Sequence, residues 1–182
     1  MAMTGLLLAL SLTAAMTDLR SHKVFNWNTY PGILLGLALN ALSEVLPLDA
    51  AQQARLGCVG LEESLKGFAA CGGLMLACFV LFNVGGGDVK LMAMLGAFLG
   101  FEQGLLALLW TFVLGGAVGL AVLIWRVGFV RLVGGSLRHV LWTLRLGSWL
   151  PLTGDERAQL QPALYLAPMA VLAVVIVRFS LI

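Results

Sequence analysis

Two aspartates stand at the ends of long uncharged runs, and both have side chains suited to proton transfer. Asp88 follows residues 67–87 and Asp18 follows residues 1–17, and neither run contains a charged side chain. Ionisable groups beside an apolar membrane segment are costly, so they are candidates for function by default. Two carboxylates held close together do not both ionise readily and share a proton near neutral pH. One can then take a proton from water while the other assists at a carbonyl, which predicts peptide hydrolysis without a metal or a covalent intermediate.

Three consecutive glycines precede Asp88. Gly85, Gly86 and Gly87 carry no side chain, so the backbone of another chain can approach closely. The structural alternative for Asp88 is a helix N-cap, at which its carboxylate would accept backbone N–H bonds. For Asp18 the alternative is an ordinary polar residue at a helix end. The chemical interpretation therefore depends on the two aspartates acting together.

The composition indicates that membrane helices position these groups. Of 182 residues 60% are hydrophobic and only 11% are charged, whereas soluble domains carry about 25% charged residues. The sequence predicts an all-α polytopic membrane protein with one membrane-embedded domain, residues 1–182. The net charge of +2 gives no indication of a nucleic-acid partner, and the three cysteines lack zinc-site spacing. We expect no metal and no other cofactor.

About six apolar segments are expected to cross the bilayer: residues 2–18, 28–46, 65–84, 88–100, 103–125 and 162–177. The fourth is shorter than the ~20 residues of a full span, so we expect other helices to surround it, where irregular backbone is tolerated. A cleaved signal peptide is the alternative for the first segment, but no basic residue precedes its apolar run. Residues 48–64 are expected to form a loop that could include a short amphipathic helix.

The basic residues predict an orientation with both termini outside the cytosol. Cytosolic loops generally carry an excess of Lys and Arg. Residues 126–157 carry arginines at intervals of seven, which favours an amphipathic helix in the cytosolic interface over two short segments that dip into the membrane. Of the 11 basic residues, eight then face the cytosol and three face outside. Both aspartates fall at the cytosolic face in this arrangement.

The surroundings of the two aspartates resemble those of the type IV prepilin peptidases. The residues that carry the resemblance are Asp18 and Arg20, with Asn26 a little further on, and Gly-Gly-Gly-Asp-Val-Lys at residues 85–90, opening a short helix. These Gly-x-Gly-Asp aspartyl peptidases belong to the bacterial inner membrane. The resemblance implies that Asp18 and Asp88 are the catalytic pair. It also implies a prepilin substrate, whose leader is cut at the cytosolic side before its hydrophobic N-terminal helix.

Arg20, Asn26 and Lys90 belong to the same two motifs and are candidates for supporting roles. Lys90 lies two residues from Asp88, so on a helix it faces away from that carboxylate. We expect its ammonium to reach toward the membrane surface as an anchor.

The sequence departs from the family pattern in two places. Phe25 stands before Asn26, where the family often has proline, and no Cys-paired cytosolic domain separates the first spans. The chain therefore resembles the short class of tight-adherence (Tad/Flp) pilus systems, and methyltransferase activity is not implied. The alternative function is a small proton- or cation-coupled transporter subunit that uses the same aspartates, although transporters more often place such acids near the midplane. An inactive scaffold in a secretion assembly is a third reading.

Overall fold

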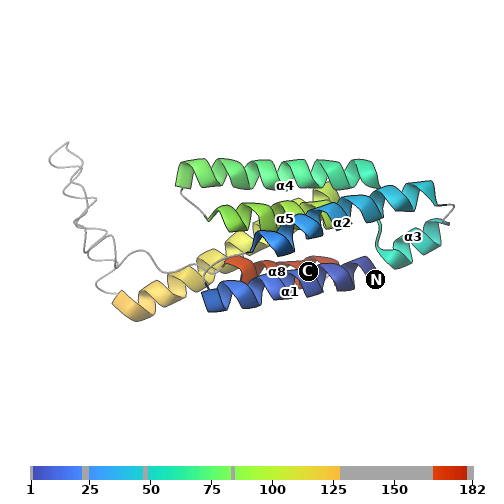
Figure 1. Ribbon diagram of the computed structural model, residues 1–182. Helices are drawn as coiled ribbons and strands as arrows, with labels where there is room; N and C mark the ends of the chain where they lie inside the picture. The colour runs from blue at the N-terminus through green and yellow to red at the C-terminus, as the bar shows by residue number, and fades with distance from the viewer. Residues whose placement is uncertain (1, 22–24, 47–48, 83–84, 128–165, 180–182) are drawn as a thin grey trace. The chain divides into compact units, whose positions relative to one another are not determined.

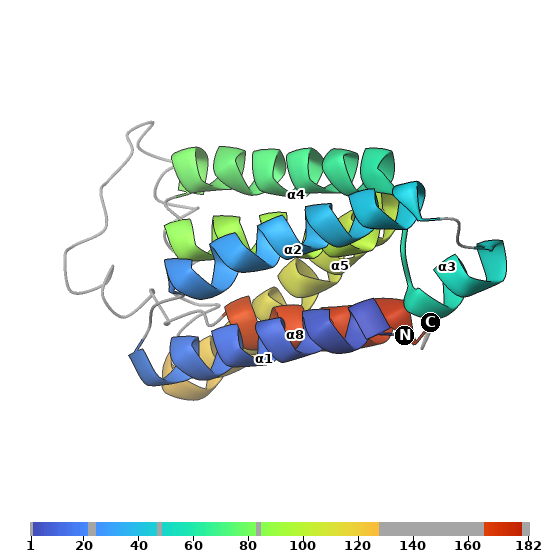
Figure 2. The same cartoon turned by 45° about the vertical axis from the view of Figure 1, so that its right-hand side comes forward.

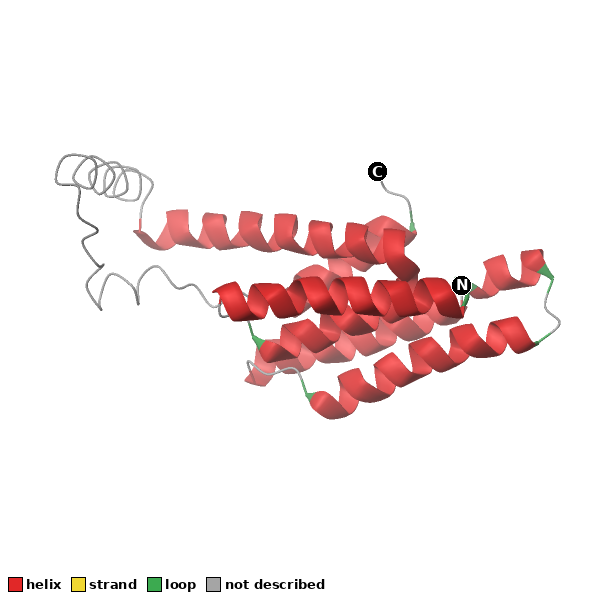
Figure 3. Ribbon diagram, turned by 90° about the horizontal axis from the view of Figure 1, so that it is seen from above, coloured by secondary structure: helices red, strands yellow, loops and turns green. Residues whose placement is uncertain are grey.

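The computed structural model describes residues 2–21, 25–46, 49–82, 85–127 and 166–179, and within this part all regular structure is helical (Figure 3). The predicted all-α fold is confirmed for these residues. The expected amphipathic helix over 126–157 lies almost wholly outside them. The helices are α1 (Ala2–Ser21), α2 (Asn26–Val45), α3 (Ala50–Leu56), α4 (Leu61–Phe82), α5 (Gly86–Val127) and α8 (Leu166–Arg178).

Contacts divide the chain into two units. The first comprises residues 1–114 and 165–182, and the second comprises residues 115–164. In the second unit the described residues, 115–127, continue α5 as helix. Among the described helices, α1, α4 and α5 as far as Trp125 have the length and apolar composition needed to cross a bilayer. The chain is therefore an integral membrane protein, and a total of about six spans stays a prediction.

Helix α5 is broken at Gly100. This glycine has φ 79° and ψ −172°, a backbone conformation that L residues with side chains rarely adopt. The break separates a short helix, residues 86–99, from the longer helix that follows. Every residue from 91 to 100 is buried, so the expectation of a short fourth helix surrounded by others is confirmed.

The carbonyl of Ala97, three residues before the break, accepts hydrogen bonds from side chains of both neighbouring helices. The Nδ2 group of Asn40 in α2 donates to this oxygen at 3.1 Å, and the hydroxyl of Ser64 in α4 donates to it as well. Asn40 also accepts a hydrogen bond from the N–H of Val59 at 2.9 Å. An unpaired backbone group in an apolar interior costs several kcal/mol. The break is thus stabilised by polar groups from both neighbouring helices.

Small residues let these neighbours approach the short helix. A Cβ on Gly67 of α4 would collide with the backbone of Gly96 and Gly100, and a Cβ on Gly96 would collide with that of Gly67. On the other side, a Cβ on Gly36 of α2 would lie 2.9 Å from the ring of Phe98. Glycine at helix contacts allows this close approach in lipid. Helix α2 also packs against α4.

Helix α1 packs against α8 and α2, and the views in Figures 1 and 2 show α1 and α8 side by side. The start of α1 meets the end of α8 near the loop after α3. There Arg178 donates to the carbonyl of Gly57 at 3.2 Å, and Cys58 Sγ lies 3.3 Å from Met3 Sδ. The opposite end of α1, which carries Asp18, therefore points away from this cluster.

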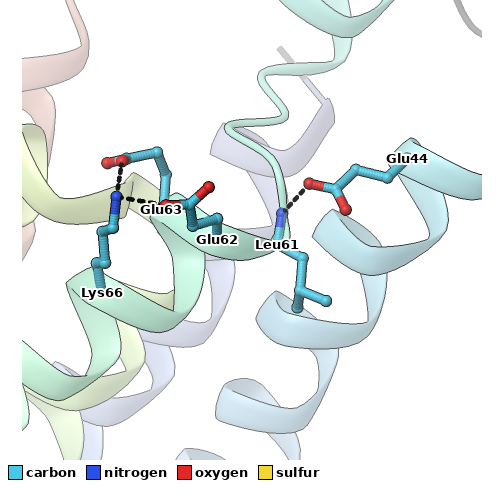
Figure 4. A network of polar contacts seen from close by, with 5 residues as sticks. All are labelled: Glu44, Leu61, Glu62, Glu63 and Lys66. Atoms are coloured by element: carbon cyan, nitrogen blue, oxygen red, sulfur yellow. Dashed lines mark hydrogen bonds and ion pairs between the residues drawn. The ribbon is translucent and has the colours of Figure 1, made fainter.

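The start of α4 differs from the expected loop over residues 48–64. Helix α3 supplies the short helix, but α4 already begins at Leu61, whose N–H donates to Glu44 Oε1 at 2.7 Å (Figure 4). Lys66 pairs with Glu62 at 2.8 Å and with Glu63 at 3.2 Å. Acidic residues in a first turn are favoured by the helix dipole, and spacings of three and four residues bring the pairs together. These interactions extend the helix into residues 61–64.

We predict that Gly67→Ala destabilises the protein, because the added methyl group must displace backbone of the short helix. Overpacking of this kind costs roughly 1–3 kcal/mol. Thermal unfolding in detergent should show a clearly lower Tm for Gly67→Ala. Gly73→Ala on the same helix is the matched control, since a Cβ there meets nothing within 4 Å. Equal Tm values for the two variants would contradict the described contact.

Candidate active site

The structure brings Asp18 and Asp88 within electrostatic reach of each other. Asp18 lies in the last turn of α1, Asp88 lies at the start of α5, and both side chains are half-buried. The charge of Asp18 acts on the carboxyl group of Asp88. Residues 70 positions apart in the sequence thus form one candidate site.

Asp88 is not the N-cap of its helix, so the structural alternative for this residue is wrong. Helix α5 begins at Gly86, so Asp88 is its third residue. The N–H of Asp88 donates to the carbonyl of Gly85 at 3.0 Å, which closes the first turn two residues earlier than expected. Glycines at residues 85 and 86 tolerate this tight entry. The carboxylate still lies in the first turn, at the end of the helix whose dipole favours a negative charge.

The carboxylate of Asp88 folds back toward Gly85. A Cβ on Gly85 would lie 3.0 Å from Asp88 Oδ2, whereas a Cβ on Gly86 would meet only the Phe79 ring at 3.8 Å. Gly85 and Gly86 are exposed, and Gly87 is half-buried. The turn therefore offers accessible backbone directly beside one carboxylate.

Lys90 contacts the start of α2, in a hydrogen bond that is exposed, and its expected role as an anchor stays a prediction. Its Nζ donates to Asn26 Oδ1 at 2.7 Å and lies 5.0 Å from the centre of the Tyr30 ring. The side chain is half-buried. Two of the three candidate supporting residues, Lys90 and Asn26, are thus brought together. The third, Arg20, is exposed in the last turn of α1.

Sequence reasoning missed two residues of this region. Asn28 Nδ2 donates to the carbonyl of Leu10 in α1 at 3.0 Å, and the Tyr30 ring faces Lys90. A tyrosine near the start of a membrane helix also fits an interfacial aromatic belt, so the residue type of Tyr30 alone does not indicate a contact with Lys90. The sequence offered one signal for this contact: Asn26 and Tyr30 are four residues apart, so both lie on one face of a helix.

The charged cluster at the start of α4 is separate from the aspartates. A groove of about 590 Å³ lies there, lined by Glu63, Lys66, Ala69, Ala70, Phe101 and Glu102. Asp88 follows the other end of α4, so the groove is not part of the candidate site. Within the described residues, no group of three or more His, Cys, Asp or Glu side chains could hold a metal ion.

Comparison with known families decides between the functions left open by the sequence. A family model described as the type IV leader peptidase family matches residues 5–120, which include both aspartates and the whole motif at 85–90. The chain belongs to the type IV leader peptidase family. It is therefore an aspartic prepilin peptidase of the membrane, and prepilins are its substrate class. A search of curated proteins and a search of solved structures found no match.

For this leader peptidase we predict that Gly85→Ala slows prepilin cleavage at least several-fold. The methyl group would contact Asp88 Oδ2 at about 3.0 Å and turn the carboxylate away, and small displacements of reacting groups are costly. Initial rates on a prepilin peptide would measure the loss. Gly73→Ala, with open space around its Cβ, is the control. Unchanged cleavage by Gly85→Ala would show that the position of this oxygen does not matter.

Proposed function

We propose that this peptidase removes the leader of Flp-like type IV prepilins at the cytosolic face of the bacterial inner membrane, with Asp18 and Asp88 as its catalytic pair. The observation that carries the proposal is the electrostatic interaction between these two half-buried carboxyl groups at the ends of separate membrane helices. Both lie within the residues that match the family model.

The proposed chemistry uses one proton shared by the pair. The ionised carboxylate takes a proton from a water molecule, whose oxygen attacks the scissile carbonyl carbon. The protonated carboxyl group hydrogen-bonds to the carbonyl oxygen and then supplies a proton to the departing amine as the C–N bond breaks. The products are the leader with a new carboxyl terminus and the mature pilin with a new amino terminus.

The glycine turn supports the binding of an extended peptide in this proposal. Backbone at Gly85 and Gly86 is exposed next to the Asp88 carboxylate. A substrate strand could approach there without meeting side chains. The hydrophobic helix of the prepilin would remain in the lipid bilayer, and its leader would extend into the cytosol.

The cytosolic placement rests on the distribution of charge. Basic residues follow Asp18 near the end of α1 and Asp88 at the start of α5, among them Arg20, Lys23 and Lys90. Basic residues near membrane segments favour the cytosolic side. No Cys-paired domain separates α1 from α2, and this supports the Flp-like class of substrate.

We predict that Asp18→Asn and Asp88→Asn each abolish leader removal. An amide neither accepts the proton from water nor donates an acidic proton, and loss of general acid–base catalysis costs roughly 10²–10⁴-fold in rate. Purified protein in detergent and a short prepilin would be followed by mass spectrometry. Asp49→Asn, at an exposed aspartate outside the site, is the control. If both variants cleave like wild type while remaining folded, the aspartates are not catalytic.

A further inference from the structure

We propose that Lys90, Asn26 and Tyr30 form a positioning clamp that holds the first turn of α5, and with it Asp88, against the start of α2. Lys90 Nζ donates to Asn26 Oδ1 at 2.7 Å and lies 5.0 Å from the Tyr30 ring centre. The role of the clamp rests on the proposed function, because it acts on one member of the proposed catalytic pair.

The environment of Lys90 favours positioning over simple anchoring. An ammonium near a membrane segment is costly, and an anchoring lysine reduces that cost by extending into water. Lys90 is half-buried, and its ammonium engages the side-chain carbonyl of Asn26 and the face of Tyr30, both of which are exposed. Hydrogen bonds from a charged donor are stronger than neutral ones, and the face of an aromatic ring attracts a cation as well. Together they fix the rotation of the first turn of α5.

The same part of α2 also contacts the helix that carries Asp18. Asn28 donates to the carbonyl of Leu10 in α1 at 3.0 Å. At 100° per residue, Asn26 and Tyr30 share one face of α2, and Asn28 lies on the opposite face. The start of α2 therefore contacts α5 on one side and α1 on the other. It sets the spacing of the two helices that carry the aspartates.

Lys90 acts through the backbone and not by pairing with Asp88. Two residues along a helix correspond to a rotation of roughly 200°, so the two side chains leave α5 on different faces. Removal of the clamp lets the first turn of α5 rotate or fray, and this moves the Asp88 carboxylate. Misplacement of a reacting group by 1 Å can cost on the order of 100-fold in rate, whereas substrate affinity depends on other contacts.

The kinetic test compares Lys90→Met, Asn26→Leu and the double variant on a prepilin peptide. We expect each single variant to lower kcat about tenfold with KM within about twofold, because the carboxylates are misplaced and not removed. The double variant should be no slower than the slower single variant, since both changes break the same contact. Lys90→Arg keeps a cation and a donor and should recover most of the rate.

Lys66→Met is the matched control, because Lys66 makes ion pairs with Glu62 and Glu63 at the start of α4, whereas Asp88 follows the end of α4. It should leave kcat unchanged. Multiplicative losses in the double variant, a wild-type kcat for Lys90→Met, or no recovery by Lys90→Arg would each overturn the clamp. Asn26 is exposed, so Asn26→Leu keeps the fold and carries the test if Lys90→Met does not accumulate.

Amide hydrogen exchange tests the clamp without any cleavage assay. Lys90→Met should speed exchange in the first turns of α2 and α5 and leave exchange in α4 unchanged. Unchanged exchange in those two turns would overturn the clamp, whatever the activity. If the wild-type protein fails to cleave prepilins but the exchange result holds, the proposed function falls and the contact stands.

Discussion

The carbonyl of Ala97 is the constraint on which the arrangement of the first unit depends. It lies in a buried helix that stops at Gly100, and in an apolar interior such a group must find a donor. Asn40 and Ser64 supply donors from the two helices on either side. This satisfies the polar backbone at the break and fixes the depth at which α2 and α4 pack against the short helix.

That depth determines where the Asp88 carboxylate lies. The short helix of residues 86–99 is about 21 Å long at 1.5 Å per residue, so fixing its end at Gly100 also fixes its start. The first turn of α5 then meets the start of α2, where Lys90 binds Asn26. Because α2 also binds α1 through Asn28, the two helices that carry the aspartates are held together by a third. The candidate site is thus a consequence of packing at both ends of one buried helix.

Features local in the sequence could be predicted, and those that join distant residues could not. The aspartates and the short fourth helix follow from uncharged runs and their lengths. The bond from Lys90 to Asn26 joins residues 64 positions apart, and the bonds to Ala97 from Asn40 and Ser64 join residues 57 and 33 apart. No periodicity or spacing reports such pairs. The early start of α4 was missed for the same reason, because its cap comes from a residue 17 positions away.

Cysteine crosslinking tests most directly whether the aspartates share one site. In a chain whose three native cysteines are replaced by alanine, Asp18→Cys and Asp88→Cys are combined and treated with a short bifunctional maleimide. Intramolecular crosslinking, detected as a bridged mass with no free thiol, is the result predicted here. A matched pair of Asp49→Cys and Asp88→Cys should give two singly modified thiols. Failure of the first pair to bridge, or equal bridging of both pairs, would contradict a common site for Asp18 and Asp88.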